Sequence, residues 1–289
     1  MRARIIPLIL VAGLLSSCNQ STGNSDTKDQ EVTAKTTHLS FKVVELSRKG
    51  GTQCPKDTDE TATDASEASE DALCALVTLS YPQMSSDVNP ELATKLNTII
   101  TQQLLDAPAS GDTENIPQSL EQFADSFIAE YQEDPNQFTS WELERTVKVA
   151  FSTDKLLTLL FEEYGYTGGA HPFSGQRYSV LSLTDGAPVV LADLLNPGYE
   201  PPLNVIGEKA FRLARELGEA DSLEEQGFSF ENNVFNLNDN FGVLKEGLEF
   251  VFNSYEIAPY AMGPTQLTIP YEDIHSLIRP DGLLGSTAQ

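Results

Sequence analysis

The spacing of apolar residues changes several times along the chain, and each change predicts an element. Residues 38–46 and 73–81 alternate in part between apolar and polar positions, which predicts two strands. Between them, residues 56–71 are acidic and polar and cannot contribute to a core. The two strands are therefore expected to form a hairpin with a long polar loop.

Helical spacing follows in two segments. Asn89 is expected to cap the first helix, with Pro90 at its first position, and Pro135 is expected to end the second. Each segment places its apolar residues on one face, as expected for helices that cover a sheet. These residues are Leu92, Leu96, Ile99, Ile100 and Leu104 in the first, and Leu120, Phe123, Ala124, Phe127, Ile128 and Tyr131 in the second.

From Trp141 onward the spacing shortens toward two residues. Strands are expected over residues 141–151, 156–166 and 177–183, joined as a meander. Pro201 and Pro202 are expected to precede a third helix, whose apolar residues run from Ile206 to Leu217 and which Gly218 ends. The remaining predictions are short strands over 234–237, 248–252 and 266–269, and a helical end over 272–278.

Helices and strands occur in runs rather than in regular alternation, which favours an α+β fold with antiparallel sheets and packed helices. We expect two lobes that share or adjoin one core. The N-terminal lobe is predicted over residues 38–155 and the C-terminal lobe over 156–280, followed by a tail over 281–289.

The first residues have the layout of an export signal. Arg2 and Arg4 precede an apolar run, and small residues lead to Cys18, which predicts a signal peptide over residues 1–17. This pattern resembles the bacterial lipoprotein box, which implies lipidation of Cys18 and a membrane anchor; the alternative is a secreted protein without lipid. Asn19 favours the outer membrane facing the periplasm in a Gram-negative host. Residues 18–37 are polar and predict a flexible tether.

Outside the cell, cysteines tend to be oxidised, so Cys54 and Cys74 are expected to form a disulfide; two separate thiols are the alternative. The formal net charge is −25. This charge disfavours nucleic acid as a partner, because phosphate binding needs a basic surface. It would attract a basic partner, although a well-solvated acidic surface is the simpler interpretation.

Two segments combine small residues, aromatic residues and prolines in an unusual way: 167–171 and 255–264. Such residues make tight turns or rigid contacts with another molecule. We therefore predict a partner-binding surface, while an architectural role in shaping turns explains the same residues equally well. The candidate residues are Gly168, Gly169, Ala170, His171, Tyr255, Pro259, Tyr260 and Pro264.

Several of these segments carry a family resemblance. Residues 77–82, 166–171, 190–195, 255–260 and 269–271 resemble, in order and spacing, the RsiV-like extracytoplasmic domain family. The resemblance implies a two-part domain similar to an anti-sigma-factor ectodomain that binds lysozyme. Related modules accompany a peptidoglycan deacetylase without being its catalytic domain. No segment here resembles the sigma-binding or membrane-spanning parts of that anti-sigma factor.

The chemistry-bearing residues argue against catalysis. The chain has three histidines, His38, His171 and His275, and it contains no zinc-protease, paired-cysteine or nucleophile-elbow motif. We expect no enzyme activity, no metal site and no cofactor. His171 is expected to bond to turn backbone rather than act as a base. The predicted function is a lipid-anchored envelope binding protein that recognises a basic, lysozyme-type muramidase; the alternatives are a peptidoglycan-binding module and an envelope hydrolase that uses His171.

Overall fold

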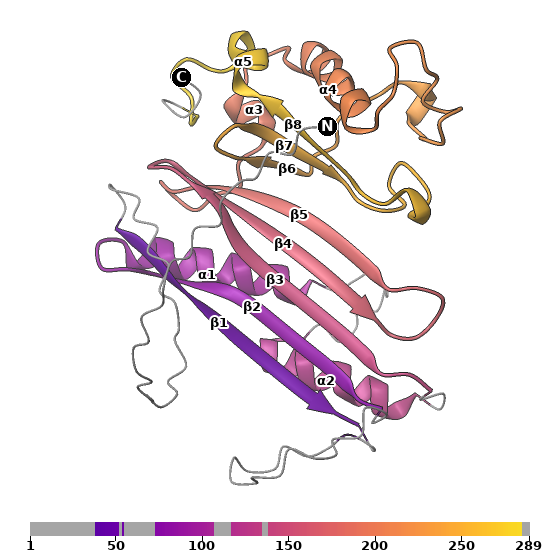
Figure 1. The fold of residues 1–289 in the computed structure, drawn as a ribbon. Coiled ribbons are helices and arrows are strands. Elements are labelled where there is room, and N and C mark those ends of the chain that lie inside the picture. The colour runs from indigo at the N-terminus through magenta and orange to yellow at the C-terminus, as the bar shows by residue number, and fades with distance from the viewer. Residues whose placement is uncertain (1–37, 52–53, 55–72, 107–116, 135–137, 285–289) are drawn as a thin grey trace, which may run out of the picture.

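The computed structural model describes residues 38–51, 54, 73–106, 117–134 and 138–284. Its larger sheet contains five strands in chain order: β1 (Leu39–Gly50), β2 (Ala75–Ser86), β3 (Trp141–Ser152), β4 (Leu156–Tyr166) and β5 (Phe173–Ser182) (Figure 1). The predicted hairpin of β1 and β2 is confirmed, as is the antiparallel meander of β3, β4 and β5.

Two helices connect β2 to β3. The first, α1 (Pro90–Leu105), begins at Asn89, whose side chain accepts a hydrogen bond from the backbone of Leu92, and the second is α2 (Leu120–Glu133). Because the connection crosses the sheet through both helices, β2 and β3 run parallel, the one parallel pair among the described strands. The sequence patterns did not predict this pairing.

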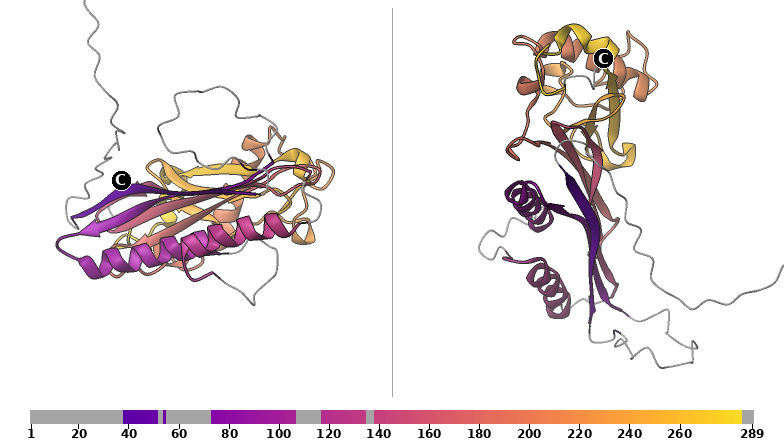
Figure 2. Two further views of the ribbon diagram at one scale, coloured as in Figure 1. Left: turned by 90° about the horizontal axis from the view of Figure 1, so that it is seen from below. Right: turned by 90° about the vertical axis from the view of Figure 1, so that its left-hand side faces the viewer.

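Both helices lie on the same face of the five-stranded sheet, and no described helix covers the opposite face (Figure 2, right). Alternate residues of the strands pack against the helices and form the first core. Its fully buried members include Val77 and Leu79 of β2, Leu96 and Ile100 of α1, and Leu159 of β4. The polar residues between them therefore face solvent on the uncovered side.

The second lobe is built on a smaller antiparallel sheet of β6 (Phe241–Val243), β7 (Gly247–Phe252) and β8 (Thr265–Pro270). Around it lie α3 (Leu191–Leu194), α4 (Glu200–Ala214), α5 (Tyr271–Ile274) and three short 3₁₀ helices, η1 (Glu231–Asn233), η2 (Tyr260–Met262) and η3 (His275–Leu277). Phe211 of α4 is fully buried and packs against four other phenylalanine rings: Phe228, Phe230, Phe235 and Phe252. These rings form the centre of a second core.

The two cores meet along the β4–β5 hairpin. Leu157 and Leu181 belong to the first core, whereas their neighbours Leu156 and Val180 belong to the second. Since successive strand residues point to opposite faces, one hairpin serves both lobes. The smaller lobe thus covers the open face of the large sheet at one end only (Figures 1 and 2).

This arrangement corrects the predicted lobe boundary. The boundary between residues 155 and 156 falls in the turn from β3 to β4, inside the sheet, which continues to Ser182. The error arose because the start of β4 and the end of β5 are apolar on both faces, so the sequence pattern there does not assign the hairpin to either lobe.

Three local predictions are also wrong. The third helix ends at Ala214 rather than at Gly218. Pro201 and Pro202 lie within its first turn rather than before it, and they are tolerated there because the N–H groups of a first turn make no hydrogen bond within the helix. Residues 234–237 form no strand. The strands over 248–252 and 266–269 and the helical end are confirmed within about two residues, a usual uncertainty at element ends.

The predicted disulfide between Cys54 and Cys74 is present, with the two Cα atoms 5.0 Å apart. It closes the β1–β2 loop beside the start of β2. The proposed signal peptide, Cys18, the tether and most of the tail lie outside the described residues. Within the described ranges, no helix has the length and apolar character needed to cross a membrane.

Candidate functional site

The first unusual segment forms the tip of the β4–β5 hairpin. Gly168 and Gly169 have φ angles of +89° and +105°, which favour glycine, and Ala170 and His171 follow them at an exposed position. The Tyr166 hydroxyl donates to the Gly169 carbonyl over 3.1 Å and closes the tip. The glycines are therefore required by the turn, as the architectural interpretation proposed.

The second segment is the loop between β7 and β8. Its Tyr255 has a φ of +68°, a strained value for a bulky residue, and the residue is 65% exposed. At the other end of this loop, the Arg215 guanidinium donates to the carbonyls of Met262, Gly263 and Pro264. The loop is thus fixed to the end of α4 while it presents a strained aromatic residue to solvent. Such strain is typical of functional positions.

The structure brings the two segments together. The His171 ring stacks on the Tyr260 ring, with centroids 4.0 Å apart and planes 15° from parallel. The Tyr255 hydroxyl lies 3.2 Å from His171 Nε2, and the rings of Tyr255 and Tyr260 are 5.7 Å apart. We call these three side chains the aromatic platform. Residues 84 positions apart in sequence therefore share one exposed surface.

The hydrogen bonds of His171 indicate which ring nitrogen carries the proton in the neutral side chain. Nδ1 lies 2.9 Å from the Pro172 carbonyl, which can only accept. In the neutral ring Nδ1–H donates to that carbonyl, and Nε2 accepts from the Tyr255 hydroxyl. This is the contact with turn backbone that the sequence analysis expects. Neither ring nitrogen contacts a carboxylate of the described residues.

Beside the platform, two asparagine side chains join the lobes. Asn253 exchanges hydrogen bonds with the backbone N–H and carbonyl of Gln176, at 2.8 and 3.0 Å. Asn240 accepts from the backbone of Tyr178 and donates to the carbonyls of Gln176 and Val251. Both amides therefore satisfy the free edge of β5 as a neighbouring strand would.

A buried carboxylate lies behind these amides. Glu249 of β7 accepts hydrogen bonds from the Tyr178 hydroxyl and, at 2.5 Å, from the Gln266 side chain. Burial of the hydroxyl raises the pKa of Tyr178 well above its ordinary value, and the hydrogen bond to Glu249 is the next largest cause of this increase. Gly242 permits this approach, because a Cβ at its position would lie 2.7 Å from the Tyr178 ring. The inter-lobe contact is thus polar and close-packed.

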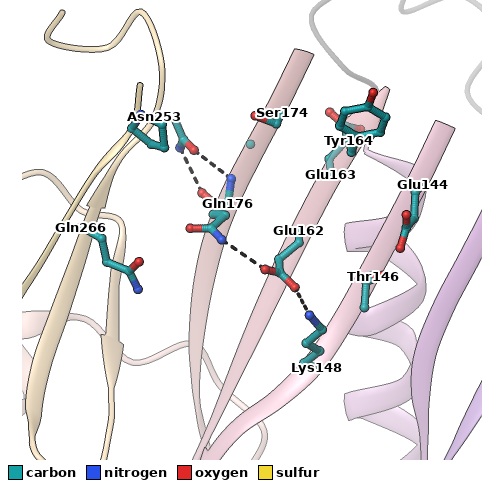
Figure 3. A pocket seen from close by; sticks show the side chains of 12 residues that line it. Glu144, Thr146, Lys148, Glu162, Glu163, Tyr164, Ser174, Gln176, Asn253 and Gln266 are labelled. Carbon is teal, nitrogen blue, oxygen red and sulfur yellow. Dashed lines mark hydrogen bonds and ion pairs between the residues drawn. The ribbon is translucent and has the colours of Figure 1, made fainter. Parts of the chain in front are cut away.

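A groove of about 440 Å³ lies where the second lobe leaves the open face of the sheet. Its walls are mainly polar side chains of β3, β4 and β5 on one side and residues of the β7–β8 region on the other (Figure 3). They include Glu144, Thr146, Lys148, Glu162, Tyr164, Ser174, Gln176, Asn253, Pro264 and Gln266. Among them only Pro264 was a predicted site residue.

The predicted partner-binding residues all lie on the two loops, and three of them form the platform. Pro259 and Pro264 are exposed on either side of η2 in the same loop. Sequence analysis missed the other groove residues. The available signal was the run of polar residues at every second position of β3, which marks an uncovered sheet face but not a groove. Within the described part of the chain, no group of His, Cys, Asp or Glu side chains could hold a metal ion.

Comparisons with known proteins agree with a two-part organisation. Residues 68–174 match the family model described as deacetylase PdaC, and residues 192–272 match a protein family of unknown function, DUF3298. The described part of the first match contains β2, α1, α2, β3, β4 and the first residues of β5, and the second match covers most of the smaller lobe. A search among curated proteins gave no match.

Two solved structures share the fold. A member of the DUF3298 family from Bacteroides fragilis is 20% identical, with a TM-score of 0.66 over 88% of this chain and 99% of the other. A DUF3298 family protein from Pseudomonas aeruginosa is also 20% identical, with a TM-score of 0.59 over 83% and 95%. The family matches and these neighbours support an uncharacterised two-part domain family.

Proposed function

We propose that this protein is a non-catalytic binding protein of the cell envelope, anchored by a lipid at Cys18, whose aromatic platform engages a basic muramidase of the lysozyme type. The observation that carries the proposal is the convergence of the β4–β5 tip and the β7–β8 loop on one exposed surface. Exposed tyrosines offer a large rigid contact area at small entropic cost, which is why they dominate many interfaces.

The strain at Tyr255 supports binding rather than architecture. In a buried tyrosine, packing of the ring would offset the conformational energy of a positive φ. Tyr255 is largely exposed, so its packing contributes little to stability. A partner that covers the ring would supply the missing contact. The acidic chain, with a net charge of −25, suits a basic partner.

The hydrogen bonds of His171 favour binding over hydrolysis as well. Both ring nitrogens already have partners within the two loops, and those bonds hold the platform together. A hydrolase with His171 as its base would lose turnover of muropeptides in His171→Ala, whereas a binding protein has no turnover to lose.

The test is a calorimetric titration of the purified chain with lysozyme at low and high salt. Tyr255→Ala should weaken binding at least about tenfold, as expected for an interface hot spot. The matched control is Val43→Ala, which truncates an apolar side chain of similar exposure, 56%, on β1. Added salt should weaken binding, because the attraction between an acidic and a basic protein is screened.

Absence of lysozyme binding at both salt concentrations would rule out this partner. Retention of the chain on washed peptidoglycan sacculi would then favour the second candidate, a peptidoglycan-binding module. Equal losses in Tyr255→Ala and Val43→Ala would place the contact somewhere other than the platform.

A further inference from the structure

The groove offers polar atoms that no described residue uses. The Glu144 carboxylate and the Ser174 hydroxyl have no hydrogen-bond partner among the described residues. The side-chain amide nitrogens of Gln176 and Gln266 each donate to a glutamate, which leaves the side-chain carbonyl oxygens (Oε1) of both residues available as acceptors. These groups come from three strands and point into one space (Figure 3).

Most of the charge in the groove is already neutralised. Glu162 pairs with Lys148 and also accepts from Gln176 at 3.1 Å. Glu163 pairs with the buried Arg145 at 2.6 Å. Only Glu144 remains without a counter-charge among the described residues. The groove is thus rich in hydrogen-bonding groups and poor in net charge, which suits an uncharged ligand with many hydroxyl or amide groups better than an ion.

Flat apolar surfaces accompany the polar groups. Tyr164 is 41% exposed, and its ring lies across the groove from Gln266 (Figure 3). Pro264, which also lines the groove, adds a second apolar surface. A volume of about 440 Å³ lies within the range of roughly 300–1,000 Å³ typical of small-ligand sites. A sugar ring has hydroxyl groups around its edge and C–H groups on its faces. Side-chain amides and carboxylates can bond to the hydroxyls, while an exposed aromatic ring can pack against a C–H face.

We propose that this groove binds an uncharged oligosaccharide. One sugar ring lies against Tyr164, and its hydroxyls donate to Glu144 and to the carbonyl oxygens of Gln176 and Gln266. Lys148 donates to a sugar oxygen with the N–H groups that its pairing with Glu162 leaves free. The site does not depend on the partner of the aromatic platform, because none of the three platform residues lines the groove.

The test is a titration of the full chain with a β-linked N-acetylglucosamine hexamer, followed by NMR shifts or calorimetry. Tyr164→Ala should weaken binding about three- to tenfold, the loss expected for one ring contact. Glu144→Ala should weaken it by a similar factor, whereas Glu144→Gln, which keeps an acceptor oxygen, should retain most of the affinity. Glu121→Ala on the exposed face of α2 is the control and should bind as the unmodified chain does.

Three outcomes would overturn the proposal. The first is a failure of the hexamer to saturate the protein. The second is binding that Tyr164→Ala and Glu144→Ala leave unchanged while Tyr255→Ala abolishes it, because the sugar would then bind at the platform. The third is loss of lysozyme binding in Glu144→Gln without any hexamer binding, which would make the groove a contact for a basic protein. Lysozyme binding itself tests the other proposal, so the two can fail separately.

Discussion

The five-stranded sheet of the first lobe carries helices on one face only, whereas the three-stranded sheet of the second lobe is covered on both faces along its middle strand, β7. In β3, buried and exposed residues alternate along the first half of the strand; in β7, all six residues are buried. The first sheet therefore leaves a free surface for the groove. The second sheet serves as a core that positions its loops, and the aromatic platform lies where a loop of each lobe meets the other.

The largest expected effect would break the compact second core. Phe211→Ala should lower the free energy of unfolding by about 3–5 kcal/mol, because the ring is fully buried among four others. Urea denaturation measures the loss. Leu213→Ala on the same helix is the control, since Leu213 is 81% exposed, and it should change stability by less than about 0.5 kcal/mol. Equal losses would mean that α4 does not pack as described.

The next effect concerns the contact between the two sheets. Asn240→Asp keeps the acceptor for the Tyr178 N–H but lacks the donors for the carbonyls of Gln176 and Val251. It should lower stability by about 1–3 kcal/mol. Asn236→Asp is the control, because Asn236 is exposed in the same segment. If both changes cost the same, the amide bridge would contribute little to joining the lobes.

A smaller effect would separate strain from binding at the platform. Tyr255→Gly should be about 1 kcal/mol more stable than Tyr255→Ala, since glycine adopts a positive φ without the steric cost that alanine bears. Both changes should weaken partner binding, because both remove the ring. Equal stability of the two variants in thermal unfolding would show that the loop relaxes and stores no strain.

The smallest effect depends on pH. Asp185 accepts hydrogen bonds from the Ala187 backbone and the Ser182 hydroxyl, which lower its folded pKa below the ordinary 3.8. Its carboxylate therefore stabilises the fold above pH 3.8, and this contribution disappears as the pH falls through the lowered folded value. The difference in urea midpoint between the unmodified chain and Asp185→Asn should shrink over that window.

The control for this measurement is Asp154→Asn in the β3–β4 turn, where no described residue contacts the carboxylate by a hydrogen bond or ion pair. It removes a carboxylate from a neighbouring turn without removing a hydrogen bond of the described residues, and its midpoint is measured over the same pH range. A difference between the unmodified chain and Asp185→Asn that persists to the lowest pH would contradict the assignment to the Asp185 carboxylate.

Local signals predicted the elements of the first lobe well, and they did so for physical reasons. Asn89 and Pro90 fix a helix start through one side-chain acceptor and one absent N–H, both of which act within a single turn. Strands with one open face must alternate, so β1 to β3 could be located at least in part from their periodicity. The second lobe was harder, because β6 has three residues and 234–237 has the composition of a strand but lies where no partner strand pairs with it.

The candidate site divides in the same way. The two unusual segments could be identified from composition, since both cluster small residues, aromatic residues and prolines where an ordinary solvated loop would carry more polar residues. Their contact could not, because His171 and Tyr255 meet only through the packing of two lobes. The groove was missed for a related reason: Gln176 and Gln266 are unremarkable in sequence, and their convergence depends on the amide bridges at the edge of β5.

The sequence by itself determined the α+β fold class, the helix starts, the disulfide between Cys54 and Cys74 and the two unusual turns, because each depends on neighbouring residues or on simple periodicity. The tertiary structure alone decided the parallel pairing of β2 with β3, the sharing of one hairpin between two cores and the meeting of the turns. Those features depend on which faces pack together. A strand that is apolar on both faces does not show in its sequence which element packs against each face.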